Sequence, residues 1–423
     1  MGILKKISKN PVVRLTSLNG VSVITRIMGG FISGKMIAFL GPAGMAIVGN
    51  LRNALVFVDT FATLGMQNGI IKYTAQYTDD KEQLKAVVST VFTAIITGVV
   101  ILGLVLGLPA QFWSSVVFNG STAYAWVFIV LGCVLPFYAG GMVLVGLLNG
   151  LGKYNRVIYI NIIGNILGVI VSAVLIFSFK TEGALAGLII TPVLVFFLSV
   201  YPLYKALGDF FFFNLAYFSE PMFKNLCSYS LMSLFTALLG PAIFIILRNH
   251  IIQVAGINAL GYWEGINRIS SFYMMFATTL QSVYFLPMLA KARTNYEVKK
   301  TWHSYYKVVV PVFFIGLVLI YLLRRQVIVI TLSDAFLPME ALFVWQLLGD
   351  LFKVSSQILA QEFFARKMVA AFIISEIASF AVLYTAGTLL INKFGAEGAT
   401  MAHLVTYVLY FAGMVWYFRK KLF

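Results

Sequence analysis

Nine ionisable side chains stand inside long apolar runs of this chain, where a charge is costly. The cations are Arg26, Lys35, Arg52, Arg268 and Lys353. The anions are Asp59, Glu264, Asp350 and Glu376. A charge at the centre of a bilayer costs about 3 kcal/mol on insertion scales, so we expect these groups to face a hydrated internal cavity. Since guanidinium forks match phosphate oxygens, arginines there predict a cationic cavity that binds an anion.

The spacing of polar residues supports this cavity. In one apolar run they recur at helical spacing, as Ser22, Arg26, Gly29 and Ser33. A second run repeats the pattern with Gln346, Asp350, Lys353 and Gln357. Residues at such intervals share one face of a helix, so each run predicts a polar stripe.

An alternative is that these charges only neutralise one another. The candidate pairs are Arg52 with Asp59, Arg268 with Glu264, and Lys353 with Asp350. Arg26 and Lys35 have no acid within one helical turn, so they are the least easily explained by such pairing. The acids also allow a second role, because Asp59, Asp350 and Glu376 can carry a proton in coupled transport.

The elements that must position these residues are membrane-spanning helices. The chain has 423 residues, of which 60% are hydrophobic and 11% charged, with a mean hydropathy of +0.91. No alternation of period two predicts strands, and helices satisfy their own backbone polar groups in lipid. The sequence therefore predicts an all-α polytopic membrane protein with about twelve spans. These are 12–38, 44–72, 84–108, 123–148, 157–178, 183–205, 223–248, 257–289, 303–323, 339–364, 368–391 and 396–418.

The net charge of +16 comes from basic residues that stand mainly between the apolar runs. Twenty-one fall on the side that holds both ends of the chain, among them Lys5, Lys6, Lys9, Lys420 and Lys421. The opposite side has five, which are Lys180, Arg248, Arg324, Arg325 and Lys393. Because basic loops stay in the cytoplasm, both termini are predicted to be cytoplasmic, and the charge indicates topology in place of nucleic-acid binding.

The two halves of the chain resemble each other at an offset near 215 residues. Phe179–Ala184 resembles Phe394–Ala399, and Gly49–Arg52 resembles Gly265–Arg268. Leu131-Gly132 also matches Leu348-Gly349. We therefore expect two six-helix bundles, residues 1–210 and 211–423, with Arg52 and Arg268 at equivalent positions. Parallel repeats of this kind commonly rock against each other to expose a central site alternately on the two sides.

Other chemistry finds little support in the residues. Cys133 and Cys227 show no ligand spacing, and His250, His303 and His403 are scattered along the chain. No nucleotide loop, metal-ligand cluster or nucleophile elbow occurs in the sequence. We therefore expect no metal, no cofactor and no catalytic residues.

Particular stretches resemble the Wzx-type flippases, bacterial translocases of polyprenyl-linked oligosaccharides. They begin with Gly41–Gly44, Asn50–Arg52 and Lys72–Tyr77. Leu286–Leu289, Trp345–Val354 and Ser375–Phe380 extend the likeness over nearly the whole chain. The family includes O-antigen translocases and flippases of enterobacterial common antigen lipid III.

The resemblance implies the fold of the multidrug/oligosaccharidyl-lipid/polysaccharide exporter superfamily, with two six-helix bundles in a V around a central cavity. It implies a multi-pass protein of a Gram-negative inner membrane. The implied substrate is undecaprenyl-pyrophosphate carrying a short glycan, which moves from the cytoplasmic to the periplasmic leaflet. The implied partners are membrane lipid and the polymerase and chain-length proteins of the same pathway.

Two alternatives remain open at this point. The first is a cation-coupled exporter of drugs or other small molecules, which a cationic cavity argues against. The second is a membrane-embedded polymerase or ligase, against which stand the short periplasmic connections. The energy source is also open, between downhill transport and coupling to H⁺ or Na⁺.

Overall fold

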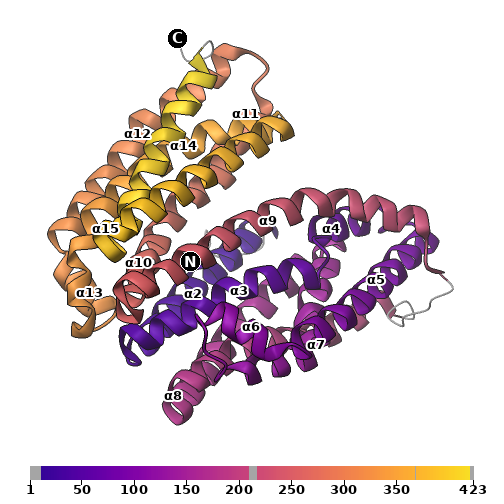
Figure 1. The fold of residues 1–423 in the computed structure, drawn as a ribbon. Helices are drawn as coiled ribbons and strands as arrows, with labels where there is room; N and C mark the ends of the chain where they lie inside the picture. Colours follow the sequence, from indigo (N-terminus) through magenta and orange to yellow (C-terminus); the bar gives the residue numbers. More distant parts are fainter. Residues whose placement is uncertain (1–10, 209–216, 367, 420–423) are drawn as a thin grey trace, which may run out of the picture. The chain divides into compact units, whose positions relative to one another are not determined.

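The computed structural model describes residues 11–208, 217–366 and 368–419. Within these residues every regular element is a helix and no strand occurs (Figure 1). Of the basic residues used above for topology, Lys5, Lys6, Lys9, Lys367, Lys420 and Lys421 lie outside the described part.

Helices α2 to α8 form the first repeat. They are α2 Pro11–Ala38, α3 Gly41–Ala62, α4 Gln67–Gln76, α5 Lys81–Gly107, α6 Ala110–Val117, α7 Ala125–Gly150 and α8 Tyr154–Leu207. Helix α8 contains two spans, because its backbone leaves the helical conformation at Lys180.

Elements α9 to α15 repeat this order. They are α9 Glu220–Ala255, α10 Ile257–Leu280, the π-helix η3 Gln281–Phe285, α11 Leu286–Lys291, α12 Asn295–Leu322, α13 Arg324–Thr331, the 3₁₀-helix η4 Asp334–Ala341, α14 Leu342–Ala365 and α15 Val369–Tyr417. Helix α15 also holds two spans, with a break at Gly395.

Each predicted span lies on these helices: α8 and α15 contain two spans each, and the second span covers α3 and α4. Eight described segments are long and apolar enough to cross a membrane, and two of them are the bent helices α8 and α15. Helices α2 and α10 are not among the eight, and they contain four of the predicted intramembrane charges. Several ends differ. The seventh span was expected to end at Arg248, but α9 continues to Ala255, and the ninth was expected to begin at 303, but α12 begins at Asn295.

Side-chain caps fix the start of equivalent helices in the two repeats. Asp80 precedes α5 and accepts hydrogen bonds from the backbone N–H groups of Glu82 and Gln83, both at 3.1 Å. Thr294 precedes α12 and forms a capping box with Glu297. Such caps satisfy backbone donors that no helix can pair internally, so each helix has a defined beginning.

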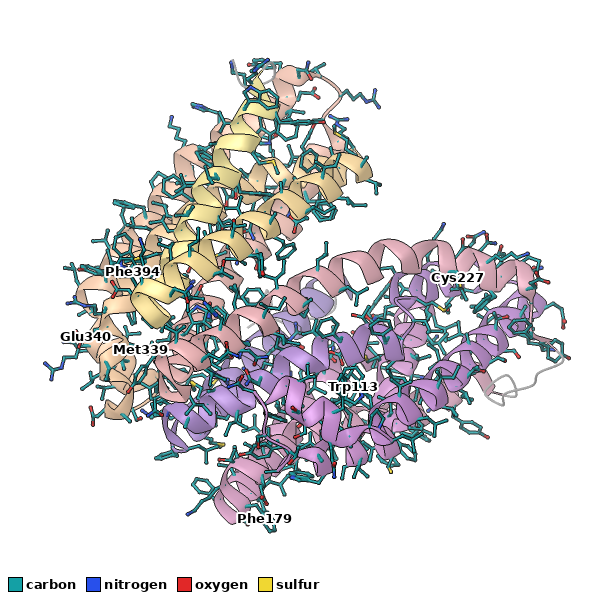
Figure 2. All side chains as sticks on the ribbon, in the orientation of Figure 1. Trp113, Phe179, Cys227, Met339, Glu340 and Phe394 are labelled. Carbon is teal, nitrogen blue, oxygen red and sulfur yellow. The ribbon has the colours of Figure 1, made fainter. Side chains whose placement is uncertain are left out.

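The two bent helices share one backbone geometry, which supports the repeat independently of residue identity. Lys180 has φ 51° and ψ −124°, and Gly395, 215 positions later, has φ 57° and ψ −132°. Phe179 and Phe394, labelled in Figure 2, directly precede the two bends. The chain therefore turns in the same way at the tip of both hairpins.

Close backbone approach at each hairpin explains a glycine that follows the bend. A Cβ atom at Gly183 would lie 1.9 Å from the carbonyl oxygen of Leu175. A Cβ atom at Gly398 would lie 2.1 Å from the carbonyl oxygen of Leu390. Only glycine allows the two arms to meet at these distances.

The chain divides into two compact units. The first unit comprises Met1–Ile37 and Asn50–Pro241, and the second comprises Ala38–Gly49 and Ala242–Phe423. The second unit thus includes Ala38–Gly49 of the first repeat, and the first unit extends into the second repeat as far as Pro241. The division at residue 210 that the sequence suggested stays a prediction.

The register of the repeat is 215 residues throughout, which corrects two sequence matches. Gly41 and Gly256 both have positive φ; Gly41 begins α3, and Gly256 directly precedes α10. From there the burial pattern of α3 follows that of α10, so Arg52 corresponds to Asn267 and not to Arg268. Leu131 is likewise buried while Leu348 is 39% exposed, so these two are not equivalent.

Candidate functional site

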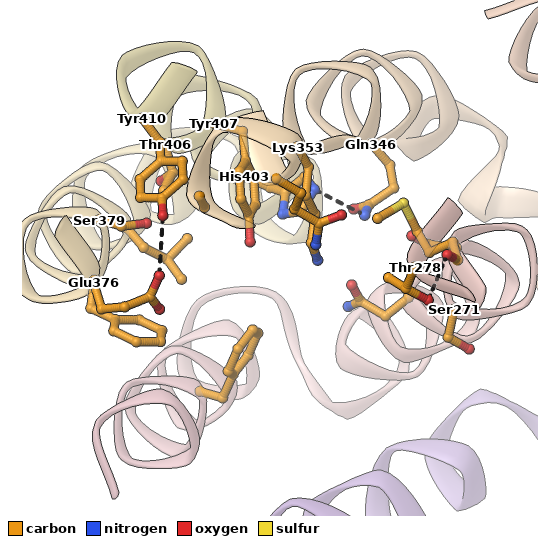
Figure 3. A pocket seen from close by; sticks show the side chains of 18 of the residues that line it. Ser271, Thr278, Gln346, Lys353, Glu376, Ser379, His403, Thr406, Tyr407 and Tyr410 are labelled. Atoms are coloured by element: carbon orange, nitrogen blue, oxygen red, sulfur yellow. Dashed lines mark hydrogen bonds between the residues drawn. The ribbon is translucent and has the colours of Figure 1, made fainter. Parts of the chain in front are cut away.

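The second unit contains a cavity of about 880 Å³ within its own helices (Figure 3). Residues from α9, α10, η3, α14 and α15 line it. Lys353 and Glu376, both expected from the sequence, are the Lys and the Glu of this lining, and His403 adds an imidazole. The other polar groups are neutral amides and hydroxyls, so the cavity is polar but close to balanced in charge.

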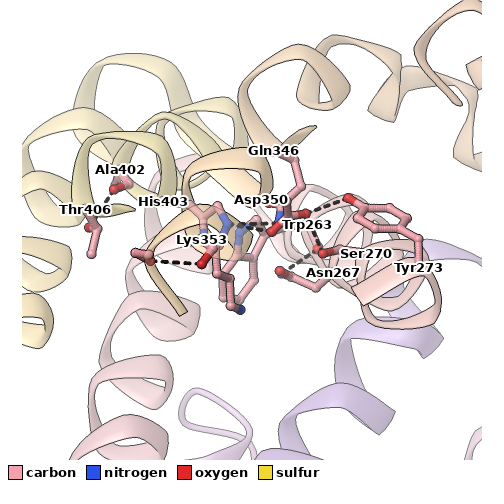
Figure 4. Close-up of polar contacts among 11 residues, drawn as sticks. Trp263, Asn267, Ser270, Tyr273, Gln346, Asp350, Lys353, Ala402, His403 and Thr406 are labelled. Carbon is pink, nitrogen blue, oxygen red and sulfur yellow. Dashed lines mark hydrogen bonds and ion pairs between the residues drawn. The ribbon is translucent and has the colours of Figure 1, made fainter. Parts of the chain in front are cut away.

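Asp350 lies beside this cavity, fully buried, at the centre of a polar network (Figure 4). Its Oδ2 accepts hydrogen bonds from Ser270 Oγ at 2.6 Å and Tyr273 Oη at 2.5 Å. Its Oδ1 lies 2.9 Å from His403 Nε2, and Gln346 Nε2 lies 3.3 Å from Oδ2. Burial of a carboxylate is costly unless it is hydrogen-bonded, and these partners provide that compensation.

Lys353 is placed apart from Asp350, although they stand three residues apart in the sequence. Its Nζ lies 5.1 Å from the centroid of the Tyr407 ring, a cation–π arrangement. Among the ion pairs of the described residues none joins Lys353 to Asp350, and the two charges interact only at longer range. The close Lys353–Asp350 pair that the charge-neutralisation alternative requires is therefore not formed in the described structure.

Glu376 faces the cavity from the first span of α15. Its Oε1 accepts a hydrogen bond from Tyr410 Oη at 3.3 Å. Its carboxylate also interacts electrostatically with Lys353. The cavity lining thus has one cation, Lys353, which contacts the ring of Tyr407, and one anion, Glu376, which accepts a hydrogen bond from Tyr410.

Glu264 makes an ion pair with a residue that the sequence analysis placed elsewhere. Arg248 was assigned to a periplasmic connection, but it is 7% exposed inside α9 and its Nη2 bonds Glu264 Oε2. The guanidinium also lies 5.4 Å from the Trp263 ring centroid. Arg268, the expected partner of Glu264, is half-buried on α10 outside the cavity lining.

The remaining predicted residues belong to the first unit. Arg26 is exposed on α2, while Lys35 and Arg52 are half-buried on α2 and α3. Asp59 accepts a hydrogen bond from Tyr138 Oη at 2.6 Å. Since these groups lie outside the cavity of the second unit, their role as an anion site stays a prediction.

Sequence reasoning missed two residues of the polar sites, and each left a signal. His403 stands within the apolar run of the last span, so the rule that selected the intramembrane acids also applies to it. Arg248 lay at an expected helix end, where a basic residue indicates an interface. Only the continuation of α9 to Ala255 places it inside.

Residues 15–293 match the family described as "Polysaccharide biosynthesis protein". The lipid III flippase of Escherichia coli K12 is 30% identical over 397 residues, which cover 92% of this chain and 94% of the relative. The chain belongs to the polysaccharide biosynthesis protein family. The lipid III flippase of Shigella flexneri matches to the same extent.

Solved structures show the fold of this family member. An inward-facing multidrug MATE transporter of the MOP superfamily aligns with TM-score 0.75 and 16% identity, over 94% of this chain and 95% of that one. The lipid II flippase MurJ aligns with TM-score 0.75 and 14% identity, over 96% of this chain and 89% of that one. At these identities the likeness concerns the fold alone.

The comparisons confirm several expectations. The all-α polytopic fold of about twelve spans and the resemblance to oligosaccharide flippases are both confirmed. The curated relatives are flippases, which confirms a transporter in place of an enzyme. The chain is a multi-pass membrane protein.

Proposed function

We propose that this protein is a flippase, which moves an undecaprenyl-pyrophosphate-linked oligosaccharide from the cytoplasmic to the periplasmic leaflet. The observation that carries the proposal is 30% identity to a lipid III flippase along nearly the full length of both chains. The glycan is an O-antigen unit or that of enterobacterial common antigen lipid III.

The physical problem of this reaction fits the charges in the spans. A pyrophosphate is the most expensive part of the substrate to carry through hydrocarbon, because isolated charge in a low dielectric is poorly solvated. Arginine can replace water around it with a bidentate fork. The proposed binding cations are Arg26, Lys35, Arg52, Arg268 and Lys353. The acids Asp59, Glu264, Asp350 and Glu376 balance these charges or carry protons during the cycle.

The cellular setting follows from the same proposal. The protein works in the bacterial inner membrane with both termini in the cytoplasm, as the basic loops favour. Its partners are the lipid-linked glycan, membrane lipid, and the polymerase and chain-length proteins of the pathway. Transport follows alternating access, in which the substrate site opens first to one leaflet and then to the other.

The test is a reconstituted leaflet assay. Purified protein in vesicles is supplied with labelled polyprenyl-pyrophosphate-linked oligosaccharide in one leaflet, and an impermeant lectin reports its arrival in the other. We expect transfer without any change in the covalent structure of the substrate. A changed covalent structure would indicate an enzyme, and transport of a drug in place of the lipid would indicate an exporter.

The glycan is identified by complementation. Flippase-deficient strains that differ only in the glycan of their lipid-linked intermediate each receive the gene. Restored surface polysaccharide in one strain and not in the others assigns the substrate. Failure in all strains, with the protein present in the membrane, would contradict the proposal.

A further inference from the structure

We propose that the cavity inside the second unit is a saccharide-binding site, which holds the glycan of the translocated lipid. This inference rests on the proposed function and assigns one part of the substrate to one part of the protein. Pyrophosphate recognition is then assigned to the proposed binding cations outside this cavity, Arg26, Lys35, Arg52 and Arg268, and not to Lys353 inside it.

The size of the cavity suits a ligand of this kind. Its volume of about 880 Å³ lies within the roughly 300–1,000 Å³ of typical small-molecule sites. Its walls come from helices of a single unit, so the site has the same lining residues whatever the position of the other unit. A short oligosaccharide therefore has both room and a defined set of contacts.

The lining has the chemistry that sugars require. Amides such as Asn267, Gln357 and Gln361 offer donors and acceptors together, as the hydroxyl groups of a sugar do. An exposed aromatic ring can pack against the C–H face of a pyranose, and Phe364 of the lining is 55% exposed. A pyrophosphate would instead require surplus positive charge, and a polyprenyl chain would require apolar walls.

Two glutamines of the lining carry an unused hydrogen-bond acceptor. In the described part of the chain, Oε1 of Gln346 and Oε1 of Gln357 are buried and accept no hydrogen bond. Leaving such an oxygen unsatisfied is unfavourable, so a donor is expected there when the protein works. A sugar hydroxyl group supplies that donor. Glu376 adds a carboxylate, whose Oε2 accepts no hydrogen bond from the described residues.

The first unit shows that the fold does not need these polar groups. At the constant offset of 215, Gln346 corresponds to Leu131 and Gln357 to Met142. The bundle of the first unit therefore packs with apolar residues where the second unit places amides. Since burying an amide costs free energy, its presence in one repeat alone indicates a ligand.

The experiment measures glycan binding to the full-length protein in detergent by calorimetry. The probe is the lipid-free glycan released by mild acid from the polyprenyl-pyrophosphate-linked oligosaccharides of the host cells. Gln346→Leu and Gln357→Met replace each amide by the residue of the first unit. We expect each to weaken binding about tenfold, the effect of one good hydrogen bond. Gln326→Met, an exposed position on α13, is the matched control and should bind as wild type does.

Three results would overturn the inference. They are wild-type protein that binds no glycan, full affinity in both cavity variants, and displacement of the glycan by inorganic pyrophosphate. The leaflet assay keeps the two proposals apart. Glycan binding without lipid transfer by wild-type protein would contradict the flippase function alone, while lipid transfer with unaltered binding in the variants would contradict the cavity assignment alone.

Discussion

The two units arrange the same helices around different interiors. The polar network of the second unit consists of Asp350 and its four partners, Ser270, Tyr273, Gln346 and His403. Its counterparts in the first unit are Leu55, Val58, Leu131, Leu135 and Leu188. Five aliphatic residues thus fill positions that the second repeat gives to a buried acid and its partners. The comparison teaches that this scaffold folds on an apolar core, so the polar interior serves a separate purpose.

The acids of the two units differ in the same sense. Asp350 is fully buried with four polar partners, while Asp59 is half-buried and receives one hydrogen bond, from Tyr138. The position of Tyr138 corresponds to that of Lys353, which holds the cation of the cavity. The polar contact at Asp59 is therefore local, whereas Asp350 belongs to a connected network.

Breaking the buried ion pair of the second unit should have a large effect on stability. Arg248→Ala deprives the buried carboxylate of Glu264 of this partner, and breaking a buried ion pair typically costs about 3–5 kcal/mol. We expect a loss of that size in the free energy of unfolding, measured by denaturant titration in detergent. Lys224→Ala in the first unit is the matched control, because its pair with Glu220 is 73% and 69% exposed. That variant should unfold as wild type does.

A double variant shows whether the pair itself stabilises the protein. Arg248→Met with Glu264→Leu removes both charges and keeps apolar volume, so most of the lost stability should return. A double variant as unstable as Arg248→Ala would mean that the geometry of the pair, and not the burial of charge, decides the effect.

Removing the acid should cost more in the second unit than in the first. Asp350→Ala leaves Ser270, Tyr273 and Gln346 without their acceptor, and unsatisfied buried groups cost about 1–3 kcal/mol each. Asp59→Ala deprives Tyr138 alone, so a loss near the lower end of that range is expected. The same denaturant titration compares them. Equal losses would refute the distinction between a connected network and a local contact.

The spans and the repeat could be predicted from the sequence because their signals are local. Apolar length sets the number of helices, and the similar stretches at Phe179 and Phe394 mark the two bends. The register was less secure. A one-residue shift made Arg52 and Arg268 look equivalent, since matched letters alone do not reveal which face of a helix is buried.

The partners of the intramembrane charges could not be predicted from such local signals. Asp350 meets Ser270 and His403 from residues 80 and 53 positions away, and no spacing rule connects them. Lys353 was a candidate partner of Asp350 because it is near in the sequence, yet in the folded chain its ammonium group lies over the ring of Tyr407. Contacts between helices depend on packing, which periodicity alone does not determine.

The hairpin glycines test whether the two repeats share one turn geometry. Gly183→Ala and Gly398→Ala each force a Cβ atom against a backbone carbonyl, at 1.9 Å and 2.1 Å. Overpacking of this kind costs about 1–3 kcal/mol, and the losses should be equal within error. Thermal unfolding of the purified variants gives the comparison. A variant that is tolerated at one site alone would show that the arms meet differently in the two hairpins.

The smallest expected effect comes from exchanging the residues at the bends. Lys180 adopts a conformation that favours glycine, so Lys180→Gly relieves backbone strain of about 1–3 kcal/mol but adds about 1 kcal/mol of unfolded-chain entropy. A net gain of about 1 kcal/mol in the free energy of unfolding is expected. Gly395→Lys should lose more than that, since its Cβ atom would also lie 3.0 Å from the Cβ atom of Ala255.

Denaturant titration of both variants measures whether the free energy of unfolding rises or falls. The leaflet assay should show unchanged transport, because neither Lys180 nor Gly395 lines the cavity. A loss of stability in Lys180→Gly would mean that the exposed lysine makes a contribution larger than the strain. The two repeats would then differ at the bends as well as in their interiors, and the shared turn would be a matter of backbone shape alone.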